Sequence, residues 1–322
     1  MKLPKWLLRV GQIALIAAAS YGIARALAPD LGRISAHDLA QWRPRISTLL
    51  LATALLVALY LFHFVLWRRI LAVLGGVKPG LKSALRVYFV SSLGRYIPGK
   101  FWQIAGLVVL AQQAGLSAVA ATAASLVGQF GFLTTGLFYL ALLLPGWGGR
   151  APIAGAVVLI VLGAGSFFVF TATRVGHAAR AALTRRFGQR FGNALMLLDR
   201  IRWHDAVLWF VAYAASWALF GMAFVAFVGA FVPLAATSHL HIAGIIAAAY
   251  LFGYVALFAP AGLGIREAVM LGLLTQVMPA SAALVVSVAS RVWLTLGELL
   301  PLALVPVVRD RANRTASDVE KD

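Results

Sequence analysis

The chain has 322 residues, of which 62% are hydrophobic and only 12% are charged, whereas soluble proteins carry about 25% charged residues. The charge is one-sided, with 28 lysines and arginines against 10 aspartates and glutamates. Because these cations lie between long apolar runs, they predict loops that touch anionic lipid headgroups and argue against a nucleic-acid partner. Cysteine is absent, which excludes disulfides, thiol nucleophiles and thiolate metal sites.

Six apolar segments are long enough to cross a bilayer as helices, which takes about 20 residues. They cover about residues 6–27, 46–66, 116–144, 151–172, 205–232 and 281–308. The first also fits a signal peptide, since a basic N-terminus precedes it and Ala26-Leu27-Ala28 supplies small residues for cleavage. We favour a retained helix because Ala14, Ala18 and Gly22 form a stripe of small residues suited to helix packing.

Two further apolar stretches, 83–113 and 242–279, are interrupted by helix-breaking residues. The first breaks at Pro98-Gly99-Lys100 and the second at Pro260-Ala261-Gly262-Leu263-Gly264. Proline removes a backbone donor and glycine weakens a helix, so each stretch predicts two short helices around a bend. The arms of the first are too short to span comfortably, and we interpret both stretches as re-entrant hairpins that line a wet cavity.

The order of these segments has an internal symmetry. Residues 1–145 contain two spans, a hairpin and a span, and residues 150–310 repeat this order from the opposite side. Inverted repeats with broken helices near the midplane are typical of many transporters. The sequence therefore predicts an all-α polytopic membrane protein, with six spanning helices and two re-entrant hairpins in one transmembrane domain over residues 1–322.

Lysine and arginine clusters indicate which loops face the cytoplasm. Three basic segments fall on the same side as the N-terminus: the linker 67–86, the loop 173–204 and the tail that leads into 310–322. Arg33, Arg43 and Arg45 fall on the other side and are outnumbered. We expect a bacterial-type inner membrane protein with cytoplasmic termini and a disordered tail. The loop 173–204 also predicts an amphipathic helix on the inner leaflet.

The first bend carries Gly94-Arg95-Tyr96-Ile97-Pro98-Gly99-Lys100-Phe101, which is close to the phosphate-binding loop of nucleotide hydrolases. Phe101 stands where that loop needs Ser or Thr for magnesium, and no buried strand precedes it, so the pattern argues against an ATP site. Arg95 and Lys100 instead flank a helix break inside an apolar segment.

The second bend leads into a helix that begins with Arg266 and Glu267. The amide groups at the start of that helix face the bend, where they can bind an anion. In the last span, Arg291 and Glu298 are two helical turns apart and share one face. Ionisable groups in hydrocarbon cost about 2.5–3.5 kcal/mol each, so they normally face the bundle interior and pair.

These segments hold more cations than carboxylates. The cations are Arg95, Lys100, Arg266 and Arg291, and the carboxylates are Glu267 and Glu298. An anionic ligand such as a lipid phosphate would neutralise the two surplus charges, with the four cations binding it and the two glutamates compensating charge in the empty site. In the alternative, Arg266–Glu298 or Arg291–Glu267 are structural ion pairs, and Arg95 and Lys100 extend to the cytoplasmic interface.

The Ile-Pro-Gly-Lys break, the Pro-Ala-Gly-Leu-Gly-Ile-Arg-Glu-Ala segment at 260–268 and the last span together resemble the lysylphosphatidylglycerol synthase transmembrane, or flippase-like, domain family. The resemblance covers nearly the whole chain and is most specific over 260–267. That family includes the lipid-translocating half of multiple peptide resistance factors and relatives linked to hopanoid and glycolipid handling. This chain departs from the family at Phe101-Trp102-Gln103, where the commoner family form has an acidic residue after the Pro-Gly turn. With Asp322 as the last residue, the resemblance implies a stand-alone member without a soluble synthase domain.

The resemblance and the charge surplus predict a non-enzyme that translocates an anionic or headgroup-modified lipid or glycolipid, without cofactor, metal or catalytic residue. One alternative is a transferase using a lipid-linked donor, for which Asp30 and Asp38 are the external carboxylates. Another is an accessory subunit of a lipid-modifying enzyme. His239 and His241 have no carboxylate or cysteine nearby in the sequence, and His63 is interpreted as a packed interior histidine.

Overall fold

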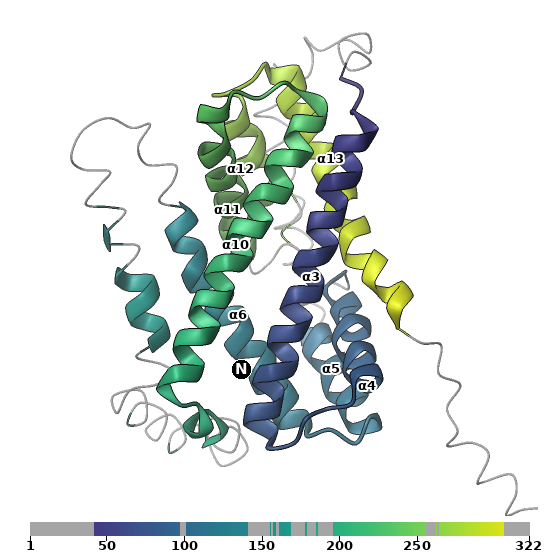
Figure 1. Ribbon diagram of the computed structural model, residues 1–322, viewed down its shortest axis with the longest axis vertical. Helices are drawn as coiled ribbons and strands as arrows, with labels where there is room; N and C mark the ends of the chain where they lie inside the picture. The colour runs from purple at the N-terminus through teal and green to yellow at the C-terminus, as the bar shows by residue number, and fades with distance from the viewer. Residues whose placement is uncertain are drawn as a thin grey trace, which may run out of the picture.

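The computed structural model describes residues 42–96, 101–140, 196–255 and 264–305, together with Gly262 and scattered residues between 155 and 185. Every regular element in these residues is a helix (Figure 1). The predicted span 6–27 and the tail 310–322 lie outside the described residues, as do half of the predicted span 151–172 and most of the loop 173–204.

Five helices in the described part of the chain are long and apolar enough to cross a membrane. They are α3 (Ile46–Gly75), α6 (Ala118–Leu140), α10 (Trp203–Phe231), α11 (His239–Val255, with the preceding turn η5, Ala236–Ser238) and α13 (Ala280–Leu299, continued by η7, Leu300–Leu304). Four of them match predicted spans. The fifth, α11, was expected as a short hairpin arm, but with η5 it reaches 20 residues.

Helix α3 is longer than the predicted span 46–66. It continues through Arg68 and Arg69, which were expected in a linker, because its last turns bury apolar side chains at helical spacing. These side chains are Trp67, Ile70, Leu71 and Leu74. The helix ends at Gly76, whose φ of 72° is left-handed and whose N–H donates to Ala72 O, as is common at helix C-termini.

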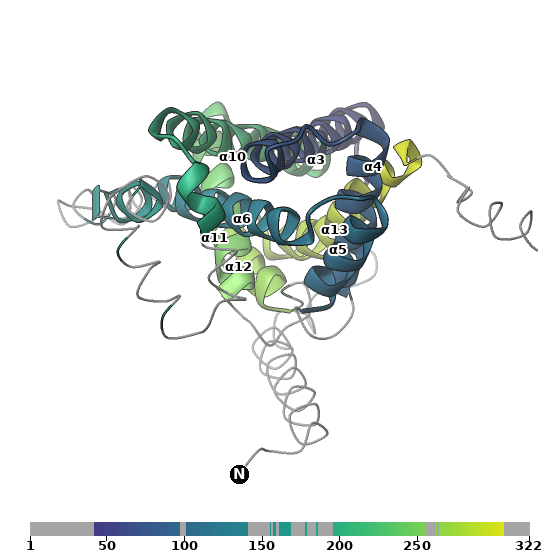
Figure 2. The ribbon, with the colours of Figure 1, turned by 90° about the horizontal axis from the view of Figure 1, so that it is seen from below.

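Helices α3 and α10 run antiparallel, side by side along one face of the molecule (Figure 2). At one end the Arg45 N–H donates to Ala230 O at 2.8 Å, and Arg45 Nη2 donates to Gly229 O at 2.6 Å. At the other end Arg200, just before α10, donates through Nη1 to Leu74 O at 2.7 Å. The start of each helix is therefore tied to the end of its neighbour.

Aromatic side chains of α10 pack on glycines of α6. A Cβ atom at Gly128 would lie 2.5 Å from the Tyr213 hydroxyl oxygen, and one at Gly136 would lie 2.7 Å from the Trp217 ring. Trp217 stacks on Phe132 at 4.3 Å between ring centroids and donates its Nε1–H to Phe132 O at 2.7 Å. Small residues thus permit the close helix contact on which membrane bundles depend.

The stretch 83–113 folds into a helical hairpin. Its first arm contains α4 (Leu81–Leu85), the π-helical turn η1 (Arg86–Val90) and the 3-10 turn η2 (Leu93–Tyr96), and its second arm is α5 (Phe101–Gln113). The arms are antiparallel because Gly94 lies against the backbone of Gln103, and Gly106 lies against Ser91. With 13 residues, α5 is about 20 Å long, well short of the hydrocarbon thickness of about 30 Å.

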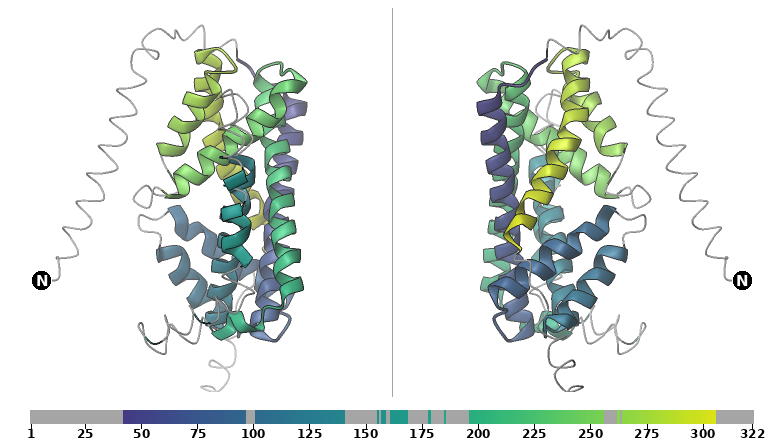
Figure 3. Two further views of the ribbon diagram at one scale, coloured as in Figure 1. Left: turned by 90° about the vertical axis from the view of Figure 1, so that its left-hand side faces the viewer. Right: turned by 90° about the vertical axis from the view of Figure 1, so that its right-hand side faces the viewer.

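The stretch 242–279 forms a second hairpin from α11 and α12 (Ile265–Leu274). Gly262 and Gly264 have φ values of 72° and 83°, which side chains with a Cβ atom rarely adopt. Gly262 also packs directly on Gly253 of α11. The two hairpins approach the middle of the molecule from opposite ends (Figure 3).

Candidate functional site

A chamber of about 220 Å³ lies where the two hairpin bends meet the last span; we call it the arginine chamber. The first hairpin contributes Arg95 and Tyr96, the second Gly262 and Arg266, and α13 contributes Arg291 and Glu298. The structure thus brings together predicted site residues that are up to 203 positions apart in the sequence. Of the other predicted residues, Pro98, Gly99, Lys100 and Pro260 lie outside the described part of the chain.

Glu298 is the centre of a hydrogen-bond network in this chamber. Its Oε1 accepts from Arg95 Nη1 at 2.9 Å and from the Tyr60 hydroxyl at 3.1 Å, and its Oε2 accepts from the Tyr96 hydroxyl at 2.6 Å. The alternative in which Glu298 pairs with Arg266 and Arg95 extends to the interface is wrong. The turn η2 places Arg95 in the chamber, where it pairs with Glu298.

Glu267 has two roles at the start of α12. Its Oε2 accepts the Gly264 N–H at 2.7 Å, which caps the helix in the manner of a capping box. Its Oε1 lies 3.7 Å from Arg291 Nη1, so the predicted Arg291–Glu267 pair is formed. The Gly264 amide, one of the helix-terminal donors expected to bind an anion, is already used by this carboxylate.

Among the described residues of the chamber, Arg266 is the arginine that forms no ion pair with either carboxylate. Its Cζ lies 4.8 Å from the centroid of the Tyr250 ring, a cation–π contact worth about 0.5–2 kcal/mol. Its Nε is buried and has no hydrogen-bond partner among the described residues. A ring face satisfies the charge in part but accepts no conventional hydrogen bond, so donors of Arg266 remain available to a ligand.

The described part of the site keeps a positive surplus. Three arginines, Arg95, Arg266 and Arg291, stand against two glutamates, Glu267 and Glu298. The difference is one net positive charge, before Lys100 is considered. An anionic group entering the chamber would balance it at the position where Arg266 presents its donors.

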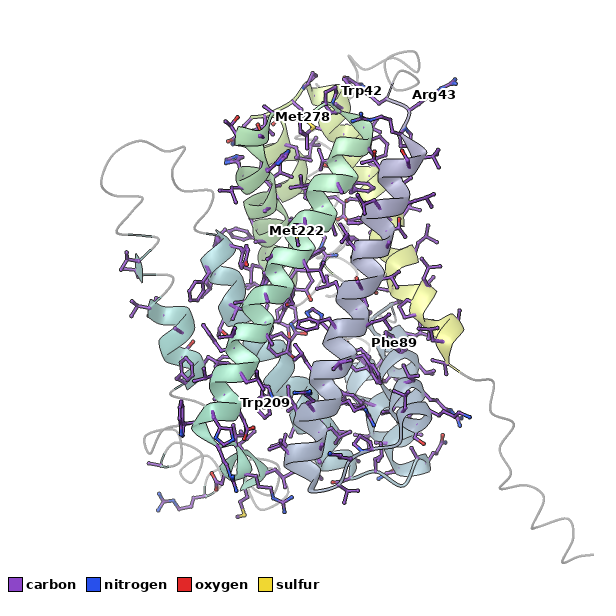
Figure 4. All side chains as sticks on the ribbon, in the orientation of Figure 1. Trp42, Arg43, Phe89, Trp209, Met222 and Met278 are labelled. Atoms are coloured by element: carbon purple, nitrogen blue, oxygen red, sulfur yellow. The ribbon has the colours of Figure 1, made fainter. Side chains whose placement is uncertain are left out.

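A second chamber of about 140 Å³ adjoins the first and reaches deeper between α3, α6 and α10; we call it the deep chamber. Both chambers are lined by Arg95, Gln103, Ile104, Ser125, Gln129, Tyr250 and Glu298. The deep chamber adds His63, Tyr88, Phe89 and Tyr213, and Figure 4 places Phe89 beside α3. His63 is indeed interior, 4.8 Å from the Phe132 ring, but it also lines this chamber.

Comparison with protein families matches residues 9–300 to the family described as lysylphosphatidylglycerol synthase TM region. The chain belongs to this family. Comparison with curated proteins and with solved structures gives no match. The match spans both hairpins and the last span, so the family resemblance expected from those segments is confirmed. Together with the five long apolar helices, it makes the chain a multi-pass membrane protein.

In this lysylphosphatidylglycerol synthase TM region, sequence reasoning found the charged residues of the site but missed its uncharged ones. Tyr60, Tyr96, Tyr250 and Gln129 all line the chambers, yet none was singled out. The available signal was polar atoms within apolar helices, where burial demands a partner. His239 and His241 lie at the start of α11, and no group of three potential metal ligands occurs in the described residues.

Proposed function

We propose that this protein moves lipids with phosphate-bearing headgroups between the leaflets of a bacterial-type inner membrane. One observation carries the proposal: Arg266 lines the arginine chamber with a buried Nε that has no hydrogen-bond partner among the described residues. A guanidinium presents several N–H donors in a planar fork that matches phosphate oxygens. A lipid phosphate would supply both the acceptors and the charge that the site lacks.

In the proposed membrane arrangement, the two hairpins are re-entrant and belong to inverted repeats with six spans and cytoplasmic termini. In this arrangement α11 is the one described arm long enough to span, and two features support re-entry. The arms α5 and α12 have 13 and 10 residues, too few to cross the hydrocarbon core. Described residues of both hairpins, among them Tyr96 and Gly262, line one chamber, the setting in which broken helices at membrane depth are tolerated.

The ion pairs give this site a way to respond to its ligand. Arg95 and Arg291 are paired with Glu298 and Glu267, so Arg266 offers the first contact to an incoming phosphate. A phosphate that then draws Arg95 away from Glu298 loosens the link between the first hairpin and α13. Movement of one hairpin against the rest of the bundle is the kind of step that alternating access requires.

The test is lipid translocation in liposomes that hold the purified protein and acyl-labelled fluorescent phosphatidylglycerol. Label that has reached the outer leaflet is bleached by dithionite, so the bleachable fraction over time reports translocation. We expect Arg266→Gln to slow translocation about tenfold or more, because hydrogen bonds to charged groups contribute about 1.5–3 kcal/mol. Arg43→Ala is the matched control, since Arg43 is exposed and lies at the far end of the molecule (Figure 4).

Two results would overturn the proposal. One is a wild-type protein that translocates no phosphate-bearing lipid, and the other is an Arg266→Gln protein that is as fast as wild type. Extraction of the labelled lipid afterwards adds a separate check. A changed headgroup would identify the protein as a transferase instead.

A further inference from the structure

The deep chamber differs chemically from the arginine chamber that it adjoins. Among the described residues, the Lys, Arg, Asp or Glu side chains that line it are Arg95 and Glu298, at the wall shared by both chambers, and they are paired with each other. The rest of its lining is aromatic, apolar or uncharged and hydrogen-bonding, with His63, Tyr88 and Gln129 among the polar members. Such a lining suits a neutral ligand with several polar atoms.

Two polar groups of this lining have unused hydrogen-bonding capacity. His63 Nε2 and Gln129 Nε2 are buried and have no partner among the described residues. A buried donor or acceptor without a partner is costly, and hydroxyl groups of a ligand would remove that cost, since a hydroxyl both donates and accepts. His63 belongs to α3 and Gln129 to α6, so the two groups approach a ligand from different helices.

A cationic headgroup fits this chamber poorly. Glu298 is its one carboxylate among the described residues, and it already accepts hydrogen bonds from Arg95, Tyr60 and Tyr96. An ammonium group in the chamber would have no free carboxylate to pair with, and the charge of Arg95 would repel the ammonium. The chamber volume of about 140 Å³ is close to that of an engineered cavity of roughly 150 Å³ that binds benzene. It therefore has room for the six atoms of one ring, and hydroxyl groups on that ring would extend toward the adjoining arginine chamber.

We propose that the deep chamber binds an uncharged, hydroxyl-bearing headgroup of the size of one sugar or inositol ring, while the arginine chamber holds the phosphate to which it is attached. This inference rests on the proposed function and names the substrate class of the same site. Gln129 lines both chambers and marks where the phosphate ends and the headgroup begins. A site with unpaired polar groups discriminates strongly against ligands that lack the matching hydroxyls.

The experiment measures binding and translocation of three labelled lipids that share acyl chains: phosphatidylinositol, phosphatidic acid and lysylphosphatidylglycerol. Binding is followed in mixed micelles by competition, and translocation in liposomes as above. For wild type we expect phosphatidylinositol to bind about fivefold to tenfold more tightly than phosphatidic acid, a factor of the size that one or two added hydrogen bonds provide. Lysylphosphatidylglycerol is expected to bind more weakly than phosphatidylinositol.

The variants Gln129→Met and His63→Phe remove the polar atoms and keep much of the side-chain volume. Each should lower phosphatidylinositol binding toward that of phosphatidic acid. His63 lines only the deep chamber, so His63→Phe should leave phosphatidic acid binding unchanged. Thr122→Val is the control, because Thr122 Oγ1 is also buried without a partner but lines neither chamber. Variant proteins are first compared with wild type by gel filtration and thermal unfolding.

The outcomes separate the two proposals. Three results would overturn the headgroup assignment and leave the phosphate site standing. They are equal binding of all three lipids, tighter binding of the lysyl lipid, and equal losses of phosphatidylinositol and phosphatidic acid binding in both variants. Loss of phosphatidic acid binding in Arg266→Gln supports the phosphate site on its own. Binding with the expected preference but no translocation would overturn the proposed function and keep the headgroup assignment.

Discussion

The Arg95–Glu298 ion pair links the first hairpin to the last span, and removing its negative partner should destabilise the protein. Glu298→Gln keeps the side-chain shape but leaves the Arg95 charge uncompensated. Removing one partner of a fully buried pair costs about 3–5 kcal/mol. Because the two side chains are 31% and 15% exposed, solvent screens part of this loss, and we expect about 2–3 kcal/mol.

The assay is unfolding in mixed micelles with increasing sodium dodecyl sulfate, followed by tryptophan fluorescence. Glu298→Gln, Arg95→Gln and the double variant form a double-mutant cycle with wild type. If the pair anchors the hairpin, the double variant loses less than the two single variants together, with a coupling of about 1–3 kcal/mol. Losses that add within about 0.5 kcal/mol would refute the reasoning, because independent residues behave in that way.

Three further variants test the packing around the chamber by the same unfolding measurement. Gly262→Ala should lose about 2 kcal/mol or more, because the φ of 72° is left-handed and the new Cβ would lie 2.9 Å from Gly253 O. Gly94→Ala should lose about 1–3 kcal/mol, since its Cβ would lie 2.7 Å from backbone atoms of the opposite arm. Tyr250→Leu should lose about 0.5–2 kcal/mol, because it removes the ring under Arg266.

Each of these variants has a matched control with the opposite expectation. Gly272→Ala and Gly80→Ala add a methyl group where no atom lies within 4 Å, so neither should destabilise the protein by more than a few tenths of a kcal/mol. Tyr250→Phe keeps the ring and should leave stability near that of wild type. Controls as damaging as their test variants would show that close approach at the bends and the ring contact are not what these residues provide.

The sequence predicted the helical hairpins because their breaks are local features. Pro98-Gly99 and the glycines of 260–264 interrupt apolar runs whatever surrounds them, and both stretches fold back in the structure. The predicted end of α3, at residue 66, was wrong because two charged residues were given too much weight. Arg68 and Arg69 suggested a linker, but the apolar stripe that includes Trp67 and Leu74 outweighs the two charges. Arg69 is exposed, and Arg68 donates to Pro79 O.

The sequence offered the Arg291–Glu267 pair as one alternative, but it gave no sign of the Arg95–Glu298 pair. Glu267 sits three residues after Gly264, so its capping role follows from spacing alone. The Arg95–Glu298 pair joins residues 203 positions apart, and no periodicity links them. The contributions of Tyr60 and Gln129 likewise depend on which helices become neighbours, which is a property of the packed bundle.

The position of the surplus charge follows from these local constraints. Capping fixes Glu267 at the first turn of α12, where its free oxygen points to Arg291. Neighbouring residues on a helix project about 100° apart, so Arg266 faces away from Glu267 and onto Tyr250. Glu298 lies within reach of the first hairpin and is held there by Arg95 and Tyr96. Each carboxylate is thus paired with an arginine other than Arg266. An anionic group that enters the chamber would neutralise Arg266.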